Sequence, residues 1–464
     1  MKVGSNGWPL LGVGLALIAG CTANIVDKGW QPMRPLGSDL ETFRPPIDPG
    51  SAAQRAPLVE PIGPLNLRQA LALAMMYSPQ LQSTAWDVRV AEARALQAGV
   101  PPNPRLGFDL ETLGALSAAE TVLQLGQAVF LTDKLYAQRR VAELERDVAG
   151  WDYEATRLNV LTGATKSFAA VVAAQEKVAL ARELAAISDK VLKTVEDRVA
   201  SGKSPPLDQM KARIEQATVA VALEQTRQEL SVARARLAAS WSSVAPAFTM
   251  AEGRMEPMRA IPSDLRLHEL VAQNPSIARW ATEMQRRQAV VKLEQRRAIP
   301  DVTLAAGWKH DASVNEDGWA ASASLEVPIF DRNQGGIKAA RYSLAKADAE
   351  SRAALAAAHL ELAEHYAALA TAHARISILR GRVLPEAARA FEASTAGFAE
   401  GKFTFLEMLD AQRTLFESQN QHVEALADFY AAATNVEGLV GQALSDVELR
   451  PEPAIRAPTQ TSEK

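Results

Sequence analysis

Two kinds of periodic pattern alternate along the 464-residue chain. Long segments place apolar residues at the three-to-four-residue spacing of amphipathic helices, and the longest runs from Lys134 to Ala200 without a proline. At 1.5 Å per residue, a helix of that length would extend for roughly 100 Å. A second helix is expected from Leu207 to about Ser242. Shorter segments alternate apolar and polar residues instead, which predicts strands.

The alternating segments form two pairs, 104–113 with 120–131 and 300–310 with 318–330. A tilted strand needs about 9–11 residues to cross a bilayer, so these segments are long enough. An apolar and a polar face on each strand is the pattern of a barrel wall between lipid and water. Positions predicted to face lipid include Leu106, Phe108, Leu304 and Leu325, and those predicted to face water include Asp109, Gln124, Ser322 and Ser324.

The same order of elements occurs twice. Ser78-Pro79 has a counterpart in Asn274-Pro275, and Pro104 has one in Pro300 at the same separation. In each copy the first pair of residues introduces a helix and the later proline precedes a strand pair. The chain is therefore expected to be a duplication of one unit, made of long helices and two strands.

The second copy also repeats the break between the long helices. Gly401-Lys402 corresponds to Gly202-Lys203, and a helical stretch at about 337–399 precedes it. Pro385 lies within that stretch and predicts an interruption of the helix. A last helix is expected to reach about Leu444.

These landmarks define the predicted organisation. Repeat 1 covers 65–244, repeat 2 covers 264–444, and a linker at 245–263 joins them. Residues 21–64 are rich in proline and glycine and lack periodicity, which is typical of an extended arm. Residues 445–464 form a polar tail that contains proline.

Composition supports this interpretation. Hydrophobic residues make up 48% of the chain but aromatic residues only 6%, because alanine, leucine and valine supply most of the apolar content. Such usage is typical of long helices, and small side chains allow extended helix–helix contact. The formal net charge of -4 gives no reason to expect nucleic acid as a partner.

The start of the chain has the pattern of a secretory signal. Met1-Lys2 is basic, and Trp8–Gly20 is uncharged and too short to span a membrane as a helix. It ends in Leu17-Ile18-Ala19-Gly20-Cys21, which resembles a bacterial lipobox. We therefore expect residues 1–20 to be a lipoprotein signal peptide and Cys21 to be acylated, although an ordinary signal peptide with a chance cysteine is the alternative. Cys21 is the only cysteine, so acylation would leave no thiol for disulfides or catalysis.

Four strands in one chain cannot enclose a water-filled lumen. Open sheet edges cannot face lipid either, because their N–H and C=O groups would lack hydrogen-bond partners. We therefore expect several chains to share one barrel, and three copies would supply twelve strands, a number within the range of bacterial barrels. A small soluble sheet packed on the helices is the competing interpretation.

No pattern in the sequence indicates catalysis, a cofactor or a metal site. The histidines are widely spaced, without the close pairs and accompanying carboxylate of a metal-binding helix. No nucleophile motif or phosphate-binding loop is present, so an enzyme is not expected and the energy for any pumping must come from a partner. The six histidines are His268, His310, His359, His365, His373 and His422.

Three stretches resemble the TolC family of outer-membrane efflux ducts, and most closely its CzcC-like heavy-metal branch. Leu67-Arg68-Gln69-Ala70-Leu71 with Ser78-Pro79 is similar to the start of that family's repeat. Glu120–Arg140 resembles the segment after the first strand pair, and Val327–Gly335 resembles the exit from the second. The resemblance covers about 65–444.

This resemblance implies a mainly α-helical duct with membrane β-strands. The implied assembly is a homotrimer with a twelve-stranded barrel in the outer membrane and a long helical barrel in the periplasm. It also implies a periplasmic adaptor protein and an inner-membrane RND-type pump as partners, and heavy-metal cations as the cargo. Contact with outer-membrane lipid follows from the same family fold.

The resemblance also suggests roles for the two turns between long helices, which would form the periplasmic tip. Glu407 and Asp410 match the family's paired tip acids, and in a trimer they would form carboxylate rings that favour cations. Thr404 and Glu407 also have the spacing of a capping box, so a structural role for Glu407 is equally open. The tip residues expected to contact the adaptor are Gly202, Lys203, Asp208, Gly401 and Lys402.

One other function remains open at this point. A periplasmic coiled-coil adaptor or scaffold lipoprotein would also carry a lipid anchor and long helices. Such a protein would have one helical hairpin with compact β domains, rather than two strand pairs at matching places in a repeat. The duct is therefore the favoured hypothesis.

Overall fold

The computed structural model describes residues 36–46, 58–111, 120–257 and 260–448. The predicted signal peptide, Cys21, the turn after the first strand and nearly all of the polar tail lie outside the described residues. Within the described residues, none of the helices combines the length and the apolar character needed to cross a membrane.

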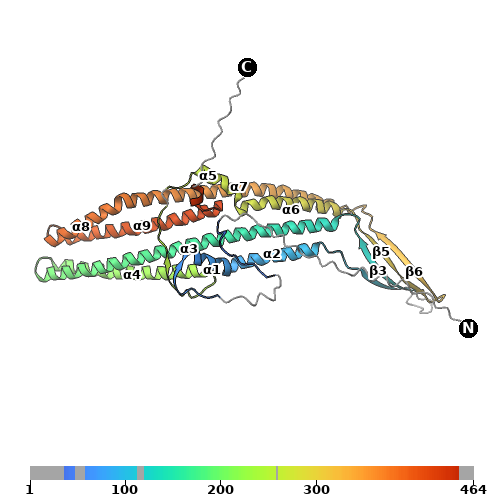
Figure 1. Cartoon of the computed structure of the whole chain (residues 1–464), viewed down its shortest axis with the longest axis horizontal. Helices are drawn as coiled ribbons and strands as arrows, with labels where there is room; N and C mark the ends of the chain where they lie inside the picture. Colours follow the sequence, from blue (N-terminus) through green and yellow to red (C-terminus); the bar gives the residue numbers. More distant parts are fainter. Residues whose placement is uncertain (1–35, 47–57, 112–119, 258–259, 449–464) are drawn as a thin grey trace, which may run out of the picture. The chain divides into compact units, whose positions relative to one another are not determined.

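Long helices dominate the fold (Figure 1). The helix α3 runs unbroken over 67 residues, Lys134–Ala200, as the sequence predicts, and α4 follows at Pro206–Ala239. In the second repeat α7 (Gln334–Ile378), α8 (Leu384–Glu400) and α9 (Phe405–Val440) hold the corresponding positions. The shorter helices are α1 (Leu67–Tyr77), α2 (Pro79–Ala98), α5 (Asp264–Leu270), η4 (Val271–Gln273), α6 (Pro275–Arg297) and α10 (Leu444–Glu448).

The duplication is visible in how the helices begin. Ser78 caps α2 by accepting from the backbone N–H of Leu81, and Asn274 caps α6 by accepting from that of Ser276. A proline occupies the first helical position in both cases, where its missing N–H costs no helical hydrogen bond. The two sequence landmarks therefore have the same structural role.

The α-helix is interrupted just before Pro385, close to the predicted position, but the chain does not leave the helix there. The chain instead makes one π-helical turn, η5 (Leu379–Val383), immediately before α8. The N–H of Leu384 bonds to the carbonyl of Leu379, five residues back. A wider turn at this point accommodates the proline, which cannot donate the usual bond four residues back.

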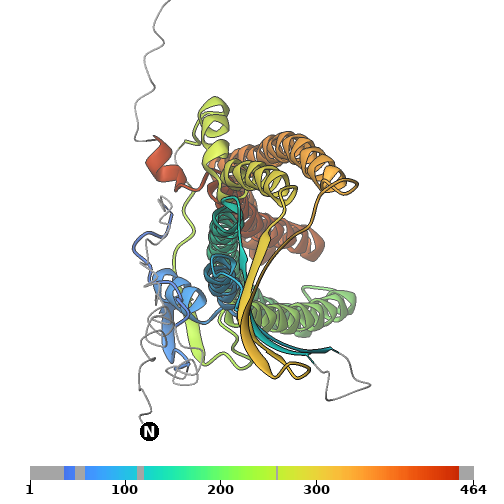
Figure 2. The ribbon, with the colours of Figure 1, turned by 90° about the vertical axis from the view of Figure 1, so that its right-hand side faces the viewer.

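Four strands form one antiparallel sheet in the order β2-β3-β5-β6. Their bounds are β2 (Arg105–Glu111), β3 (Glu120–Val129), β5 (Val302–Asp311) and β6 (Glu316–Leu325). The hydrophobic alternation predicts a last strand that reaches residue 330, but β6 ends at Leu325. Pro328 lies shortly beyond this end and has no N–H to donate to a neighbouring strand. The strands extend beyond the ends of the long helices (Figure 1), and seen from the strand end they form one curved layer (Figure 2).

A second, parallel pair was not predicted. β1 (Gly63–Asn66), at the end of the expected arm, pairs with β4 (Phe248–Glu252), inside the expected linker. Leu65 and Phe248 from these strands are buried with Phe168 of α3 and with Trp241. The linker is thus partly ordered by packing against the first repeat.

Residues 36–46 lie across α2 and α3, and we call them the strap. Tyr153 donates from its hydroxyl to the carbonyl of Phe43 at 3.0 Å, and Arg157 donates from Nη1 to that of Leu36 at 3.1 Å. Arg157 also pairs with Glu154 at 2.9 Å, and both side chains are almost fully buried, with 4% and 1% exposed. A buried, paired charge therefore fixes the strap to the long helix.

Candidate functional site

The two turns between long helices have the same backbone construction. Gly202 and Gly401 both adopt positive φ, 70° and 80°, which glycine tolerates at the end of a helix. The next residue bonds back to the helix in each case: Lys203 N–H to the carbonyl of Arg198 at 2.8 Å, and Lys402 N–H to that of Gly397 at 2.7 Å. Both lysine side chains are exposed. We call these two turns, with the first turns of α4 and α9, the tip.

The two turns of the tip pack on each other. Phe398 of α8 and Phe405 of α9 are buried with Val195 of α3 and Ala212 of α4. Arg198 lies over the ring of Phe398 at 4.7 Å and donates from Nη1 to the carbonyl of that residue at 3.0 Å. Because α3 begins beside the sheet and ends here, the tip lies at the opposite end of the long helices from the strands (Figure 1).

Glu407 forms the capping box that its spacing with Thr404 predicts. The carboxylate accepts from the N–H of Thr404 at 2.7 Å, and the Glu407 N–H donates to the Thr404 hydroxyl at 3.3 Å. The Thr404 hydroxyl also donates to this carboxylate at 2.9 Å. The backbone hydrogen bond from Thr404, and then this hydroxyl bond, hold the pKa of the Glu407 carboxyl below its ordinary value. The side chain is exposed, so a role at the start of α9 does not prevent a role in a pore.

Asp410 lies on the next turn of α9 and is exposed. Close to it Arg413 bridges from α9 to Glu215 of α4, and hydrogen bonding to this carboxylate raises the pKa of the Arg413 guanidinium. Arg413 also has a weaker electrostatic interaction with Asp410. The proposed acid pair therefore stands beside a cation that links the two helical hairpins.

Sequence reasoning missed Arg198 and Arg413, the residues that connect the hairpins. Both contact residues about 200 positions away, and no local spacing indicates such a contact. Asp208 lies in the first turn of α4, where Pro205 occupies the N-cap position. Ser204, just before it, accepts a hydrogen bond from Nε of Arg198 at 3.2 Å. The tip is thus held by side chains outside the predicted set.

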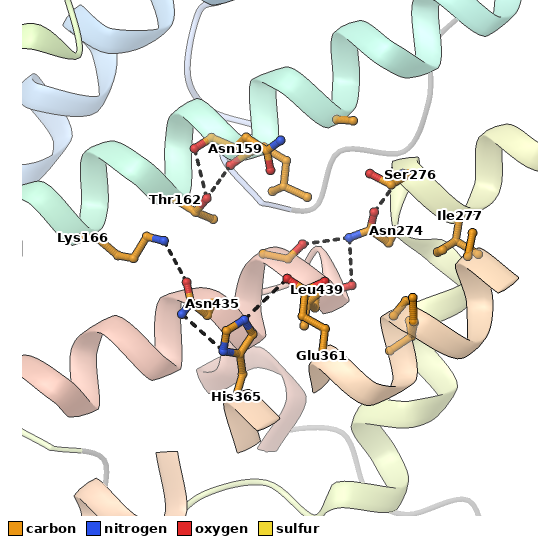
Figure 3. Close-up of a pocket in the computed structure, with 17 residues that line it drawn as sticks. Asn159, Thr162, Lys166, Asn274, Ser276, Ile277, Glu361, His365, Asn435 and Leu439 are labelled. Carbon is orange, nitrogen blue, oxygen red and sulfur yellow. Dashed lines mark hydrogen bonds and ion pairs between the residues drawn. The ribbon is translucent and has the colours of Figure 1, made fainter. Parts of the chain in front are cut away.

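A cavity of roughly 430 Å³ lies between α3, α6, α7 and α9 (Figure 3). Lys166 donates to Asn435 at 2.9 Å, Asn435 contacts His365, and His365 pairs with Glu361 at 3.6 Å. These polar side chains contact one another across the cavity.

The histidines are closer to carboxylates than the sequence analysis recognised. Asp264 and Glu361 each lie one helical turn before a histidine, His268 and His365 respectively. His268 also meets His359 of α7, with 2.8 Å between their Nδ1 atoms. No group of three or more potential metal ligands converges within the described residues.

The register of the sheet separates its two faces sharply. Phe108, Leu123, Trp308 and Trp319 are cross-strand partners in one row and therefore share a face. All the positions predicted to face lipid lie on this side, which we call the apolar face. All those predicted to face water lie on the other side, where Gln124 donates to Asp109 at 2.7 Å. The apolar and polar faces predicted for each strand therefore stay on opposite sides of the sheet across all four strands.

Large apolar side chains on this face are not covered. Leu106 is 74% exposed, Phe108 66% and Trp319 87%. A single chain therefore displays a broad apolar surface on a sheet whose two edge strands, β2 and β6, each have one unpaired side. Such a surface is typical of a protein that contacts a membrane or another chain.

Paired strand hairpins, long helical hairpins and an uncovered apolar sheet face together define an outer-membrane channel, and the chain belongs to the outer membrane efflux protein family. The family model matches residues 70–243 and 267–442, which correspond closely to the two repeats. Members of this family are channels rather than enzymes, and they do not act as coiled-coil adaptors. The scaffold alternative is therefore excluded.

Two curated relatives are named for resistance to metals. It is 33% identical to the cobalt-zinc-cadmium resistance protein CzcC of Cupriavidus metallidurans, over 87% of this chain and 94% of that protein. It is 28% identical to the nickel and cobalt resistance protein CnrC of the same organism, over 66% and 71% of the two chains.

Solved structures support the fold independently. A CusC structure matches with a TM-score of 0.70 and 17% identity, covering 81% of this chain and 92% of that one. The outer membrane protein VceC from Vibrio cholerae matches with a TM-score of 0.66 and 19% identity, covering 82% and 96%. The predicted TolC-like fold is thus confirmed.

Proposed function

We propose that three copies of this chain form a passive exit duct through the outer membrane. The observation that carries the proposal is the sheet order β2-β3-β5-β6, with its uncovered apolar face. The two edge strands, β2 and β6, run in opposite directions, so copies can join edge to edge while every pair stays antiparallel. Three copies would close a twelve-stranded barrel and leave no unpaired edge in lipid.

Conductance in planar bilayers tests this function directly. Purified protein should insert as a heat-modifiable trimer and give discrete steps of current. Variants with a charge on the polar face, such as Ser322→Asp, should change the ion preference, while the number of channels inserted should stay the same. A monomer that gives no current steps would refute the proposal.

Arginine in place of Leu304 is expected to destabilise the inserted barrel by about 2–4 kcal/mol, because its charge would face the middle of the bilayer. Ser322→Arg serves as the matched control, since residue 322 lies on the opposite face of the sheet. The measurement is the urea concentration that unfolds protein folded into lipid vesicles. Equal shifts for both variants would contradict the assignment of faces.

Heavy-metal cations are the proposed cargo. The support is the similarity to relatives named for resistance to cobalt, zinc, cadmium and nickel. A duct need not bind what it conducts, and the described residues hold no cluster of metal ligands. Expression with a matching pump should raise metal tolerance of a sensitive strain without changing its tolerance of organic drugs.

The tip is the proposed meeting point with a periplasmic adaptor, which would connect the duct to an inner-membrane RND-type pump. Gly202 and Gly401 shape the turns, and Lys203, Asp208 and Lys402 are polar side chains placed on or beside them. Glu407 and Asp410 are the proposed pore constriction. Crosslinks from cysteine at Lys203 or Lys402 to the adaptor would support this arrangement.

Cys21, which lies outside the described residues, is the proposed lipid attachment site. Cys21→Ser should abolish acylation and leave a mature protein whose mass lacks the lipid. Assembly of the barrel should persist, because the sheet itself contacts the membrane. Mass spectrometry of the intact protein tests this, and identical masses for variant and wild type would contradict it.

A further inference from the structure

The segment that follows the second strand pair is longer than its counterpart in the first repeat. Eight residues, 326–333, separate β6 from α7, whereas four, 130–133, separate β3 from α3. The helical spans beyond these segments, Lys134–Ala200 and Gln334–Glu400, occupy equal numbers of positions. The additional residues of the second repeat therefore lie in this exit loop.

The exit loop displays three large apolar side chains. Val327 is 70% exposed, Ile329 62% and Phe330 89%. The shorter counterpart has one strongly exposed apolar residue, Leu131 at 57%, whereas Phe130 is half-buried and Lys134 lies 5.9 Å from the centre of its ring. The extra residues thus add exposed apolar surface rather than core.

Hydrogen bonds fix the exit loop in this outward arrangement. The N–H of Ile329 donates to the carbonyl of Val327 at 2.9 Å, and Nε2 of Gln334 donates to that of Phe330 at 3.1 Å. Nδ2 of Asn333 reaches the carbonyl of Glu294 in α6 at 2.9 Å. Exposing apolar surface to water is unfavourable by about 25 cal/mol per Å², so a defined loop that does so indicates a partner.

The position of the exit loop indicates that the partner is lipid. The exit loop follows directly on Leu325, which lies on the apolar face with Trp319, and in the sequence Val327 and Ile329 continue the spacing of apolar residues at every second position. At the other end of the apolar face, Trp319 lies in one cross-strand row with Phe108 and Trp308. The next row on the same face, farther from the exit loop, is mostly polar: it contains Thr121, His310 and Asp317, together with Leu110 of β2.

The distance between the two aromatic levels fits a membrane. Eleven positions separate Trp319 from Phe330, which corresponds to at most roughly 28 Å along the barrel axis at the usual strand rise and tilt. Membrane barrels carry an apolar band of about 25 Å with aromatic residues at both interfaces. Asp331 and Arg332 follow directly and place charge just outside the band.

We propose that the exit loop, through Val327, Ile329 and Phe330, lies in the periplasmic lipid–water interface and sets the depth of the sheet, with Trp308 and Trp319 at the opposite interface. The proposal rests on the duct function given above. It assigns a lipid contact to a segment outside the sheet.

Spin labels on introduced cysteines test the depth. Labels at Phe330→Cys and Leu304→Cys would be compared in vesicles of phosphatidylethanolamine and phosphatidylglycerol, using oxygen as the lipid-soluble and a nickel chelate as the aqueous collision partner. Phe403→Cys is the matched control, because Phe403 is also an exposed phenylalanine but lies in the tip turn. The Cys21→Ser background removes the only other cysteine.

The expected result is a shift of the collision ratio at residue 330 toward oxygen, between the values at Leu304 and Phe403. A label at 330 that behaves like the one at Phe403 would overturn the interfacial loop while leaving the barrel intact, provided that the label at Leu304 meets oxygen. Protection of residue 330 from both collision partners would show that a second copy covers it, which also overturns the proposal. Contact of the Leu304 label with the nickel chelate would refute the duct itself.

Discussion

Replacing Arg157 by methionine is expected to destabilise the folded chain by about 3–5 kcal/mol, because it leaves a buried carboxylate without its guanidinium partner. Arg157 and Glu154 are only 4% and 1% exposed, so water cannot replace the lost interaction easily. The same change removes the hydrogen bond from Nη1 to the carbonyl of Leu36 and so loosens the strap. The denaturation midpoint of the purified protein, and protease cleavage within residues 36–46, measure both effects.

Arg227→Met is the matched control. Arg227 pairs with Glu224 at the same three-residue spacing, but the two side chains are 49% and 58% exposed. An exposed pair of this kind contributes only about 0.2–1 kcal/mol, so the control should leave the midpoint nearly unchanged. The double variant Glu154→Gln with Arg157→Met should recover part of the loss, since it removes the buried charge. Similar losses for the buried and the exposed pair would contradict this account.

Replacing both Glu407 and Asp410 by alanine is expected to have the largest effect on conduction. In the proposed trimer these residues bring six carboxylates into a narrow lumen, where they attract cations strongly. Their loss should lower the preference for cations and weaken block by multivalent cations. Single-channel recordings with cobalt or calcium on the tip side measure both quantities.

Thr404→Ala separates the pore role from the capping role, because it removes the cap hydroxyl and leaves both acids in place. Loss of this N-cap should cost about 0.5–2 kcal/mol in the start of α9 without changing ion preference. Because hydrogen bonding lowers the pKa of Glu407 in the folded protein, its stabilising contribution is present above the ordinary carboxyl pKa and is lost as pH falls through the lowered value. If Thr404→Ala reproduces the conduction of the double variant, while multivalent block persists in that variant, these acids serve only the helix.

Local periodicity made the repeat architecture predictable. The span of α3, the two strand pairs and their apolar faces each follow from spacing within one segment, which is the information a single sequence carries. The capping box at Thr404 was visible for the same reason. Even the end of β6 at Leu325 had a local cause, since Pro328 follows it closely, although the hydrophobic alternation continues to Ile329.

Contacts between distant segments could not be predicted in this way. The pairing of β1 with β4 depends on burial against Phe168 and Trp241, and neither strand has a pattern of its own. The ion pair between Arg413 and Glu215 joins α9 to α4. In the sequence, nothing distinguishes these two residues from the other charged residues of the two helices. Both contacts form when segments distant in the sequence pack together, and spacing within one segment does not predict that packing.

The π-helical turn before α8 makes the two halves of the chain unequal. A residue of an α-helix turns the chain by about 100°, so one extra residue in a wide turn shifts the faces of the helix that follows by about this angle. The helix α3 has no such turn. The helical spans Lys134–Ala200 and Gln334–Glu400 therefore reach the tip with different angular phase, although they contain equal numbers of residues. Six hairpins in the proposed trimer would alternate between two kinds, so a partner that contacts all six would encounter threefold rather than sixfold symmetry and would have to bind neighbouring hairpins in two distinct ways.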